Sequence, residues 1–115
     1  MGMANVIWQT DANAIALRSI AYASAPPFII NLAGPEQFSI KRTCEALGQR
    51  LDRQPFFTGQ AGPSAILSNA QKAHQLFGYP QTSLSNMLDH TARWIMQEGE
   101  LLGKPTKFEV IDGKF

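Results

Sequence analysis

The sequence predicts a mixed α/β domain built around a strand–helix–strand unit, with several further helices after it. Three patterns indicate this unit: an apolar run at 6–8, a long alanine-rich helix pattern, and a second apolar run at Phe28–Ile30. The second run lacks in-out alternation, which is typical of a strand covered on both faces, as in parallel sheets. Parallel strands need a long crossover, and the intervening helix supplies one.

Length and charge limit the function classes. At 115 residues the chain suits one domain with a modest core. Its formal net charge is +1, and no basic stripe indicates a nucleic-acid partner or an anionic membrane surface. No apolar stretch approaches the roughly 20 residues of a membrane span, and no signal peptide pattern opens the chain. We therefore expect a single cytoplasmic domain over residues 1–115, with neither nucleic acid nor membrane as partner.

The first strand is predicted at Val6–Gln9, and Thr10 or Asp11 is predicted to cap the following helix through a free backbone N–H. That helix should continue to about Ser24, because Pro26-Pro27 forbid its continuation. The second strand lies in "PFIINLAG", which Gly34-Pro35 close.

Few side chains of the first predicted helix are polar. Arg18 and Tyr22, one turn apart, suit contact with water, as do the nearby Asn13 and Ser19, whereas alanine, isoleucine and leucine occupy the rest. A helix that is apolar around most of its circumference is usually buried on several sides. We infer that the chain belongs to a longer polypeptide or to an obligate oligomer. The alternative is a compact monomer whose alanine-rich helix tolerates partial exposure.

The middle of the chain predicts an ordinary amphipathic helix. Ser39 should cap the helix 40–52, whose apolar residues recur at helical spacing and form one buried stripe: Ile40, Cys44, Leu47 and Leu51. The segment 55–59 is predicted as a short strand and 60–64 as a loop. A further strand is possible at 65–68.

Two more helices are predicted before a short tail. The first, 69–77, should end where Gly78 adopts a left-handed conformation. Ser83 or Ser85 should start the last helix and Gly99 should close it, with one row of Leu84, Leu88, Thr91 and Ile95. The tail offers an extended piece at 108–111 and a turn at Asp112-Gly113.

Few residues carry a catalytic or metal-binding pattern. His74 and His90 have no second ligand at metal spacing, and a surface or core role explains each of them. The single cysteine, Cys44, excludes an internal disulfide framework and is best interpreted as a small core residue. Ser64 lies in "GPSA", which lacks the second glycine of a nucleophile elbow. The residues therefore predict no metal site and no catalytic residue.

Four stretches occur in a recognisable order: "VIWQTDANAIAL", "FIINLAGPEQFSI", "SNAQKAHQLFGYP" and "SLSNML" before a tryptophan-bearing helix. Together they resemble the C-terminal portion of extended short-chain dehydrogenases/reductases, the NAD-dependent epimerase/dehydratase family. The resemblance covers nearly the whole chain. In that family this smaller portion closes over a small-molecule substrate, and an N-terminal Rossmann portion binds NAD or NADP.

The resemblance also implies what is missing. The Rossmann portion of this family carries a glycine fingerprint and a Tyr-x-x-x-Lys pair. Neither occurs here, since Tyr22 is followed four residues later by Pro26 and Tyr79 by Ser83. The resemblance therefore implies a substrate domain that binds no cofactor itself and is not catalytic alone. NAD or NADP would belong to a full-length parent, whose Rossmann domain, in cis, would cover the first helix and the "FIINL" strand.

Departures from the family pattern concern the substrate. Sugar-nucleotide epimerases usually carry an arginine where this chain has Ala4, and an arginine and an acid where it has "QAGPS". Such arginines hold diphosphate or ribose by bidentate bonds, so a nucleotide-sugar substrate is doubtful. The residues that we expect near the cleft, at strand ends and in the loop 59–64, are Asn5, Trp8, Gln9, Gly59, Gln60 and Ser64.

Two functions are therefore carried forward. The first is the substrate-binding domain of an NAD(P)-dependent epimerase/dehydratase or reductase-like protein. The second is a free-standing, non-enzymatic module that pairs through its apolar helices, as a homodimer or with a partner subunit. The identity of the substrate is not predicted by either.

Overall fold

The computed structural model describes residues 2–60 and 62–104. Those residues form four α-helices, one 3-10 helix and three two-residue strands. Their order is β1 (Met3–Ala4), α1 (Gln9–Ser19), η1 (Ile20–Tyr22), β2 (Phe38–Ser39), α2 (Ile40–Arg50), β3 (Ala65–Ile66), α3 (Gln71–Phe77) and α4 (Leu84–Met96). The predicted extended piece at 108–111 and the turn at Asp112-Gly113 lie outside the described residues.

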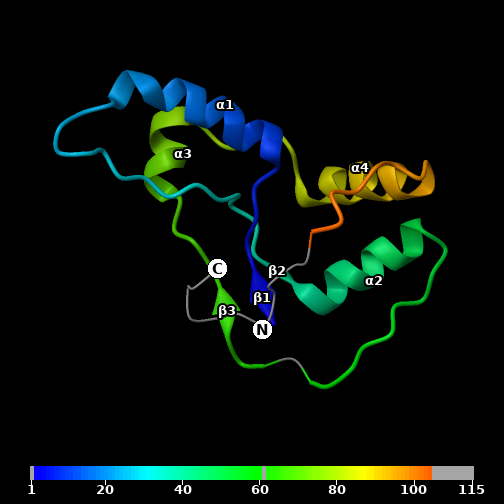
Figure 1. Ribbon diagram of the computed structural model, residues 1–115. Coiled ribbons are helices and arrows are strands. Elements are labelled where there is room, and N and C mark those ends of the chain that lie inside the picture. The colour runs from blue at the N-terminus through cyan, green and yellow to red at the C-terminus, as the bar shows by residue number, and fades with distance from the viewer. Residues whose placement is uncertain (1, 61, 105–115) are drawn as a thin grey trace.

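A small sheet lies at the centre, with the strand order β2-β1-β3 (Figure 1). Ala4 pairs with Phe38 of the antiparallel neighbour β2 and with Ile66 of the parallel neighbour β3. The pairing continues beyond the strands, because the Gly2 N–H donates to the Ser64 carbonyl at 2.9 Å. The prediction of a strand at 65–68 is therefore confirmed in its first two residues, and the fold is a mixed α/β fold, as predicted.

The predicted strand–helix–strand unit is wrong. Val6–Trp8 is extended without belonging to a strand, and Gln9 already lies in α1. Phe28–Leu32 has no assigned strand, and none of the backbone hydrogen bonds outside helices and strands involves it. An apolar run becomes a strand only where a second strand supplies its backbone partners. The described part of the chain supplies none here, and the strand predicted at 55–59 is absent for the same reason.

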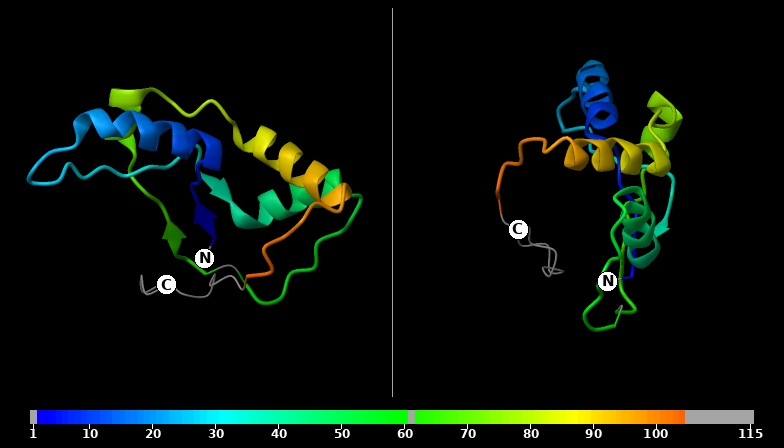
Figure 2. Two further views of the ribbon diagram at one scale, coloured as in Figure 1. Left: turned by 45° about the horizontal axis from the view of Figure 1, so that its top comes forward. Right: turned by 90° about the vertical axis from the view of Figure 1, so that its right-hand side faces the viewer.

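One end of the molecule holds α1 and α3 side by side (Figures 1 and 2). Ile15 of α1 packs with Ala73 and Phe77 of α3, and Ile7, Ile30 and Leu32 lie against this cluster. The Phe77 ring also meets Tyr22 edge-on, with ring centroids 5.4 Å apart. The Arg18 side chain lies over Phe77 and donates to its carbonyl oxygen at 2.8 Å. This cluster is the main apolar core of the described residues.

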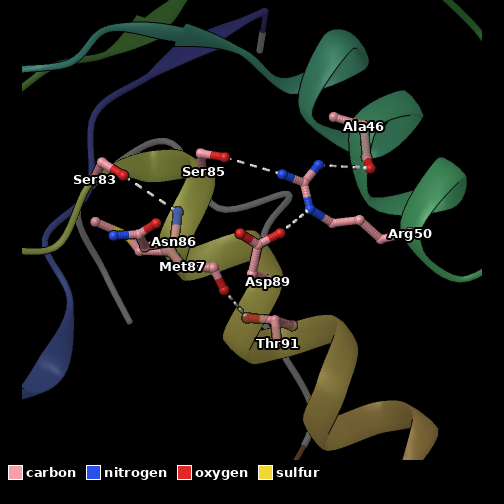
Figure 3. A network of polar contacts seen from close by, with 8 residues as sticks. All are labelled: Ala46, Arg50, Ser83, Ser85, Asn86, Met87, Asp89 and Thr91. Carbon is pink, nitrogen blue, oxygen red and sulfur yellow. Dashed lines mark hydrogen bonds and ion pairs between the residues drawn. The ribbon is translucent and has the colours of Figure 1, made fainter.

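The other end holds α2 and α4, which are joined by polar contacts (Figure 3). The Arg50 guanidinium reaches from α2 to the Asp89 carboxylate on α4 at 2.6 Å and to the Ser85 hydroxyl at 3.0 Å. It also donates to the Ala46 carbonyl within its own helix. Arg50 therefore holds the two helices at a fixed spacing.

The serine caps are confirmed, and the cap of the first helix is wrong. Ser39 and Ser83 occupy the N-cap positions of α2 and α4, and each hydroxyl accepts from a backbone N–H three residues later. By contrast, α1 begins at Gln9 after Trp8, without a side-chain cap. Asp11 accepts instead from the Thr82 N–H at 3.0 Å. Its carboxylate therefore ties α1 to the segment that leads into α4.

The helix ends follow the prediction in part. Gly78 ends α3 with φ +82°, in the positive-φ region that was predicted, although its ψ of 176° is extended rather than helical. The last helix ends at Met96 rather than at Gly99, and Glu98 takes a positive φ of 54°. The first helix likewise ends at Ser19 and continues only as the η1 turn to Tyr22, short of Ser24.

Much apolar surface is uncovered. The buried hydrophobic residues of the described chain are five alanines with Ile15 and Phe77. Leu17 is 71% exposed, Ile20 68% and Ile29 80%. The predicted shortage of covering surface around the first helix is therefore confirmed for this chain by itself.

Candidate functional site

The predicted site residues do not form one cluster. Asn5 lines a polar groove and Trp8 lines a second, aromatic groove, whereas Gln9, Gly59, Gln60 and Ser64 line neither. Asn5 and Trp8 lie on the same extended segment between β1 and α1.

The polar groove has a volume of about 440 Å³ and lies between β1, the turn before β2 and the start of α3. Most of its lining side chains are uncharged hydrogen-bonding groups: Asn5, Gln37, Ser68, Asn69, Gln71, His74 and Tyr79. Among residues 2–60 and 62–104, neither a carboxylate nor a lysine or arginine lines it. Such a groove can bind an uncharged polar ligand through hydrogen bonds.

Asn5 is already occupied by the protein backbone. Its amide donates to the Ser68 carbonyl at 2.9 Å, and its side-chain oxygen accepts from the Ser68 N–H at 2.9 Å. The same amide lies 3.4 Å from the Gly34 carbonyl. Asn5 therefore joins the strand-end segments on either side of it, and its role in the described structure is to position the wall of the polar groove.

His74 and Tyr79 form the aromatic part of the polar groove. The His74 Nε2 atom lies 2.9 Å from the Ala33 carbonyl oxygen, so this nitrogen carries a proton and donates. The two ring centroids are 4.8 Å apart, and Tyr79 is 65% exposed. The Asn69 side-chain oxygen accepts from the Gln71 N–H at the start of α3. Its amide faces no protein acceptor within the described chain.

The aromatic groove has a volume of about 500 Å³ and lies between the start of α1 and one face of α4. It is lined by Trp8, His90, Thr91, Arg93, Trp94 and Gln97. Trp8 and His90 are neighbours, with ring centroids 5.6 Å apart. Trp8 is half-buried because it is the residue that immediately precedes α1, where the chain turns from the sheet into the helix.

Trp94 is fixed by the residues that follow its helix. Its indole N–H donates to the Glu100 carbonyl at 3.2 Å, and the Gly99 N–H donates to the Trp94 carbonyl at 2.9 Å. Gly99 lies so close to the indole that a Cβ atom there would stand 2.2 Å from Cε2. Only glycine fits at this position without a shift. Trp94 is nevertheless 51% exposed, so part of its ring is free to contact a ligand.

The loop of Gly59, Gln60 and Ser64 lies away from both grooves. Gly59 has φ +76° with open space around it, and Gln60 and Ser64 are exposed. The Ser64 carbonyl pairs with Gly2 at the edge of the sheet. Gln9 is likewise exposed, in the first turn of α1. A binding role for these four residues stays a prediction.

Among residues 2–60 and 62–104, no group of three or more His, Cys, Asp or Glu side chains could hold a metal ion. No helix in the same ranges is long and apolar enough to cross a membrane. The two grooves therefore offer hydrogen bonds, aromatic surface and one arginine, which are means of binding.

The missed residues are those that come together only in space. Tyr79 and Gln37 line the polar groove with Asn5, and Arg93 and Gln97 line the aromatic groove with Trp8. Their only sequence signal was the "G-Y-P" exit for Tyr79 and the helical spacing of Arg93, Trp94 and Gln97 on one helix. Neither signal identifies a partner 40 to 90 residues away.

Comparisons with known proteins show a likeness in fold to a solved structure. No protein-family model matches the chain, and no curated protein matches it in sequence. The fold is similar to the crystal structure of UDP-glucuronic acid 4-epimerase from Bacillus cereus in complex with NAD, with a TM-score of 0.65 and 21% identity. The match covers 86% of this chain and 33% of the epimerase chain. The chain thus has the fold of part of an NAD-dependent epimerase and spans about a third of its length.

Proposed function

We propose that this chain is the substrate-binding, C-terminal portion of an NAD-dependent epimerase/dehydratase-like protein of the extended short-chain dehydrogenase/reductase type. It is not catalytic alone. The observation that carries the proposal is the uncovered apolar surface on α1, η1 and Phe28–Leu32, in a chain whose fold matches a third of an epimerase. A domain that leaves this much apolar surface in water needs a covering partner.

The position of this surface supports the proposal. Leu17 and Ile20 are exposed on α1 and η1, and Ile29 is exposed on the segment that returns from them. Phe28–Leu32 is extended and apolar, and it lacks the strand partners that its sequence demands. In the proposed parent, the Rossmann domain in cis supplies these partners and covers the first helix.

In this proposal the cofactor binds to the remaining part of the parent protein and not to this chain. The likeness to an epimerase that was solved with NAD supports NAD or NADP as the cofactor of the parent protein. This chain lacks the G-x-G-x-x-G turn that brings a pyrophosphate to a helix N-terminus. Its own residues do not fit a dinucleotide, and its contribution is to bind and orient a small-molecule substrate.

The substrate would contact the wall of the polar groove and the neighbouring strand ends. Asn5, Trp8 and Gln9 lie along one segment, and Gly59, Gln60 and Ser64 belong to the loop that leads into β3. The uncharged lining of the polar groove favours a ligand with hydroxyl or amide groups over a diphosphate. This agrees with the absence of an arginine at Ala4.

A second function is favoured by the same exposed residues. A homodimer that joined two copies through Leu17, Ile20 and Ile29 would also cover this surface, without any catalytic domain. Size-exclusion chromatography over a range of concentrations distinguishes the two. A dimer that forms through this surface, and is lost in Ile20→Asp, favours the free-standing pairing module.

The mass of the native polypeptide tests the proposed function. In an extract of the source cell, an antibody against this chain should recognise a polypeptide of about 300 residues or more. This is the length expected of a protein that contains both a Rossmann domain and this domain. A band at the size of this chain would contradict the proposal and favour the pairing module.

A thermal-shift titration with NAD and NADP provides a second test. The purified chain should show no saturable rise in melting temperature, because ligands stabilise a protein only through binding to its folded state. A saturable rise of several degrees with either dinucleotide would show that the chain binds the cofactor itself, which contradicts the assignment.

A further inference from the structure

The aromatic groove brings together the only two tryptophans of the chain, Trp8 and Trp94. They come from the two ends of the sequence, one before α1 and the other near the end of α4. The volume of about 500 Å³ lies within the range of small-molecule sites, roughly 300–1,000 Å³. Three of its six lining residues, Trp8, His90 and Trp94, are aromatic, and aromatic rings bind other rings through stacked or edge-to-face contacts.

The aromatic walls of this groove are held in place before any ligand arrives. The indole N–H of Trp94 is bonded to the Glu100 carbonyl, and Gly99 lies against the ring. Trp8 lies at the turn into α1, in contact with His90. Side chains that are already ordered lose little conformational entropy on binding. The ordered aromatic side chains of the groove can therefore bind the flat face or the edge of a planar ligand with little loss of their own conformational entropy.

Charge selects among planar ligands. Arg93, which is exposed, is the one arginine among the described residues that line the groove, and no carboxylate of the described chain lines it. Within residues 2–60 and 62–104, the Arg93 guanidinium has neither a hydrogen bond nor an ion pair with the protein. The nearby Asp89 is already paired with Arg50. An unpaired guanidinium presents a planar fork that matches the two oxygens of a carboxylate.

We propose that the aromatic groove binds a small aromatic monocarboxylate, with its ring against Trp8 and Trp94 and its carboxylate on Arg93. One guanidinium matches one negative charge, whereas a diphosphate would bring charges for which the groove holds no further arginine or lysine. The proposal rests on this groove alone and does not depend on the proposed function of the whole chain.

Intrinsic fluorescence tests the proposal directly, because every tryptophan of the chain lines the groove. The probe is 3-phenylpropionate, titrated while the indoles are excited where the probe does not absorb. We expect a saturable change in emission, with a dissociation constant of about 1 mM or lower. Two matched probes serve as controls: 3-phenylpropanol has the ring without the charge, and propionate has the charge without the ring. Each should bind at least about tenfold more weakly.

Two arginine variants complete the test. Arg93→Gln should weaken binding of 3-phenylpropionate about tenfold, which corresponds to the loss of a charge-assisted hydrogen bond worth ~1.4 kcal/mol. Arg42→Gln removes the same charge from an exposed position on α2 and should leave binding unchanged, and circular dichroism confirms that both variants are folded. No saturable change in emission, equal binding of the uncharged probe, or equal weakening in both variants would overturn the proposal. None of these results bears on the mass of the native polypeptide.

Discussion

The two ends of the molecule solve the problem of helix burial in different ways. The α2 and α4 helices are amphipathic, and they face each other with Arg50, Asp89 and Ser85 between them. The α1 helix packs on α3 through Ile15, and no other helix of the described chain covers its remaining apolar residues, so Leu17 is left 71% exposed. The α2–α4 end is joined by polar contacts within this chain, although Ile95 and Met96 are exposed there as well, whereas the α1–α3 end is joined by an apolar cluster and leaves Leu17, Ile20 and Ile29 exposed.

The difference between the two ends indicates which helix needs a further covering partner. An amphipathic helix carries the information for one partner face, whereas a helix without a polar face needs partners on several sides. Only Ile15 of α1 is buried in this chain. Substitutions at each end should change the free energy of unfolding by different amounts, and these amounts measure how independent the two ends are.

The largest effect is expected at the core of the α1–α3 end. Phe77→Ala should lower the free energy of unfolding by about 3–5 kcal/mol, because the ring packs against Ile15 and Ala73 and little else can fill the space. Urea unfolding measures this change. Phe56→Ala is the matched control, since Phe56 is 90% exposed and its loss should change stability by less than about 0.5 kcal/mol. Equal losses would show that the core is misplaced.

A charge placed on either of two adjacent residues sharpens the boundary of this end. Ile30 packs against the core cluster, so Ile30→Asp should unfold the chain or cost about 2 kcal/mol or more. Ile29 is 80% exposed, and Ile29→Asp should leave the melting temperature of the chain nearly unchanged. In a native assembly that covers Ile29, this second variant should instead disrupt association. An unchanged melting temperature in Ile30→Asp would contradict the described packing.

A smaller effect is expected at the start of α4. Ser83→Ala should cost about 1 kcal/mol, because its hydroxyl accepts from the Asn86 N–H at the helix N-terminus. Ser85 lies two residues away, where its hydroxyl accepts only from Arg50. Ser85→Ala should therefore cost less, and thermal unfolding of the two variants provides the comparison. A greater loss of stability in Ser85→Ala than in Ser83→Ala would show that Ser83 is not the residue that caps α4.

The smallest effect is expected from the ion pair between α2 and α4. The side chains of Arg50 and Asp89 are 27% and 49% exposed, so solvent screens their attraction. A double-mutant cycle with Arg50→Ala and Asp89→Ala should give a coupling energy of about 0.5 kcal/mol, which falls as salt is added. A coupling of several kcal/mol, independent of salt, would mean that the pair is buried in the native protein.

Local sequence signals predicted the starts of α2 and α4 correctly, but the stripe of Ile40, Cys44, Leu47 and Leu51 that was predicted to be buried is only half-buried, with Ile40 exposed. Ser39 and Ser83 start their helices because a hydroxyl three residues before a free N–H is sufficient, and no distant residue is needed. The same logic failed for Asp11, whose carboxylate binds Thr82 from a distant part of the chain. The strand predicted at Phe28–Leu32 is absent because no segment of the described chain pairs with its backbone.

The candidate site could be predicted only in outline. Asn5 and Trp8 line grooves, as their position at a strand end suggested, but Asn5 is bonded to Ser68 and the two residues face different grooves. Arg93 and Tyr79 were missed because their neighbours in the grooves come from distant segments. Pattern within a single helix or turn does not report such neighbours.

The central claim is that the backbone of Phe28–Leu32 and the exposed side chains of Leu17, Ile20 and Ile29 have no covering partner within the described chain. Hydrogen–deuterium exchange of the purified chain, at a concentration where it is monomeric, tests this most directly. The amides of Phe28–Leu32 should exchange as fast as those of the exposed loop at Gly59, while those of α2 and α4 exchange slowly. Strong protection of Phe28–Leu32 in the monomer would contradict the claim, because it would show that the chain already supplies the strand partner.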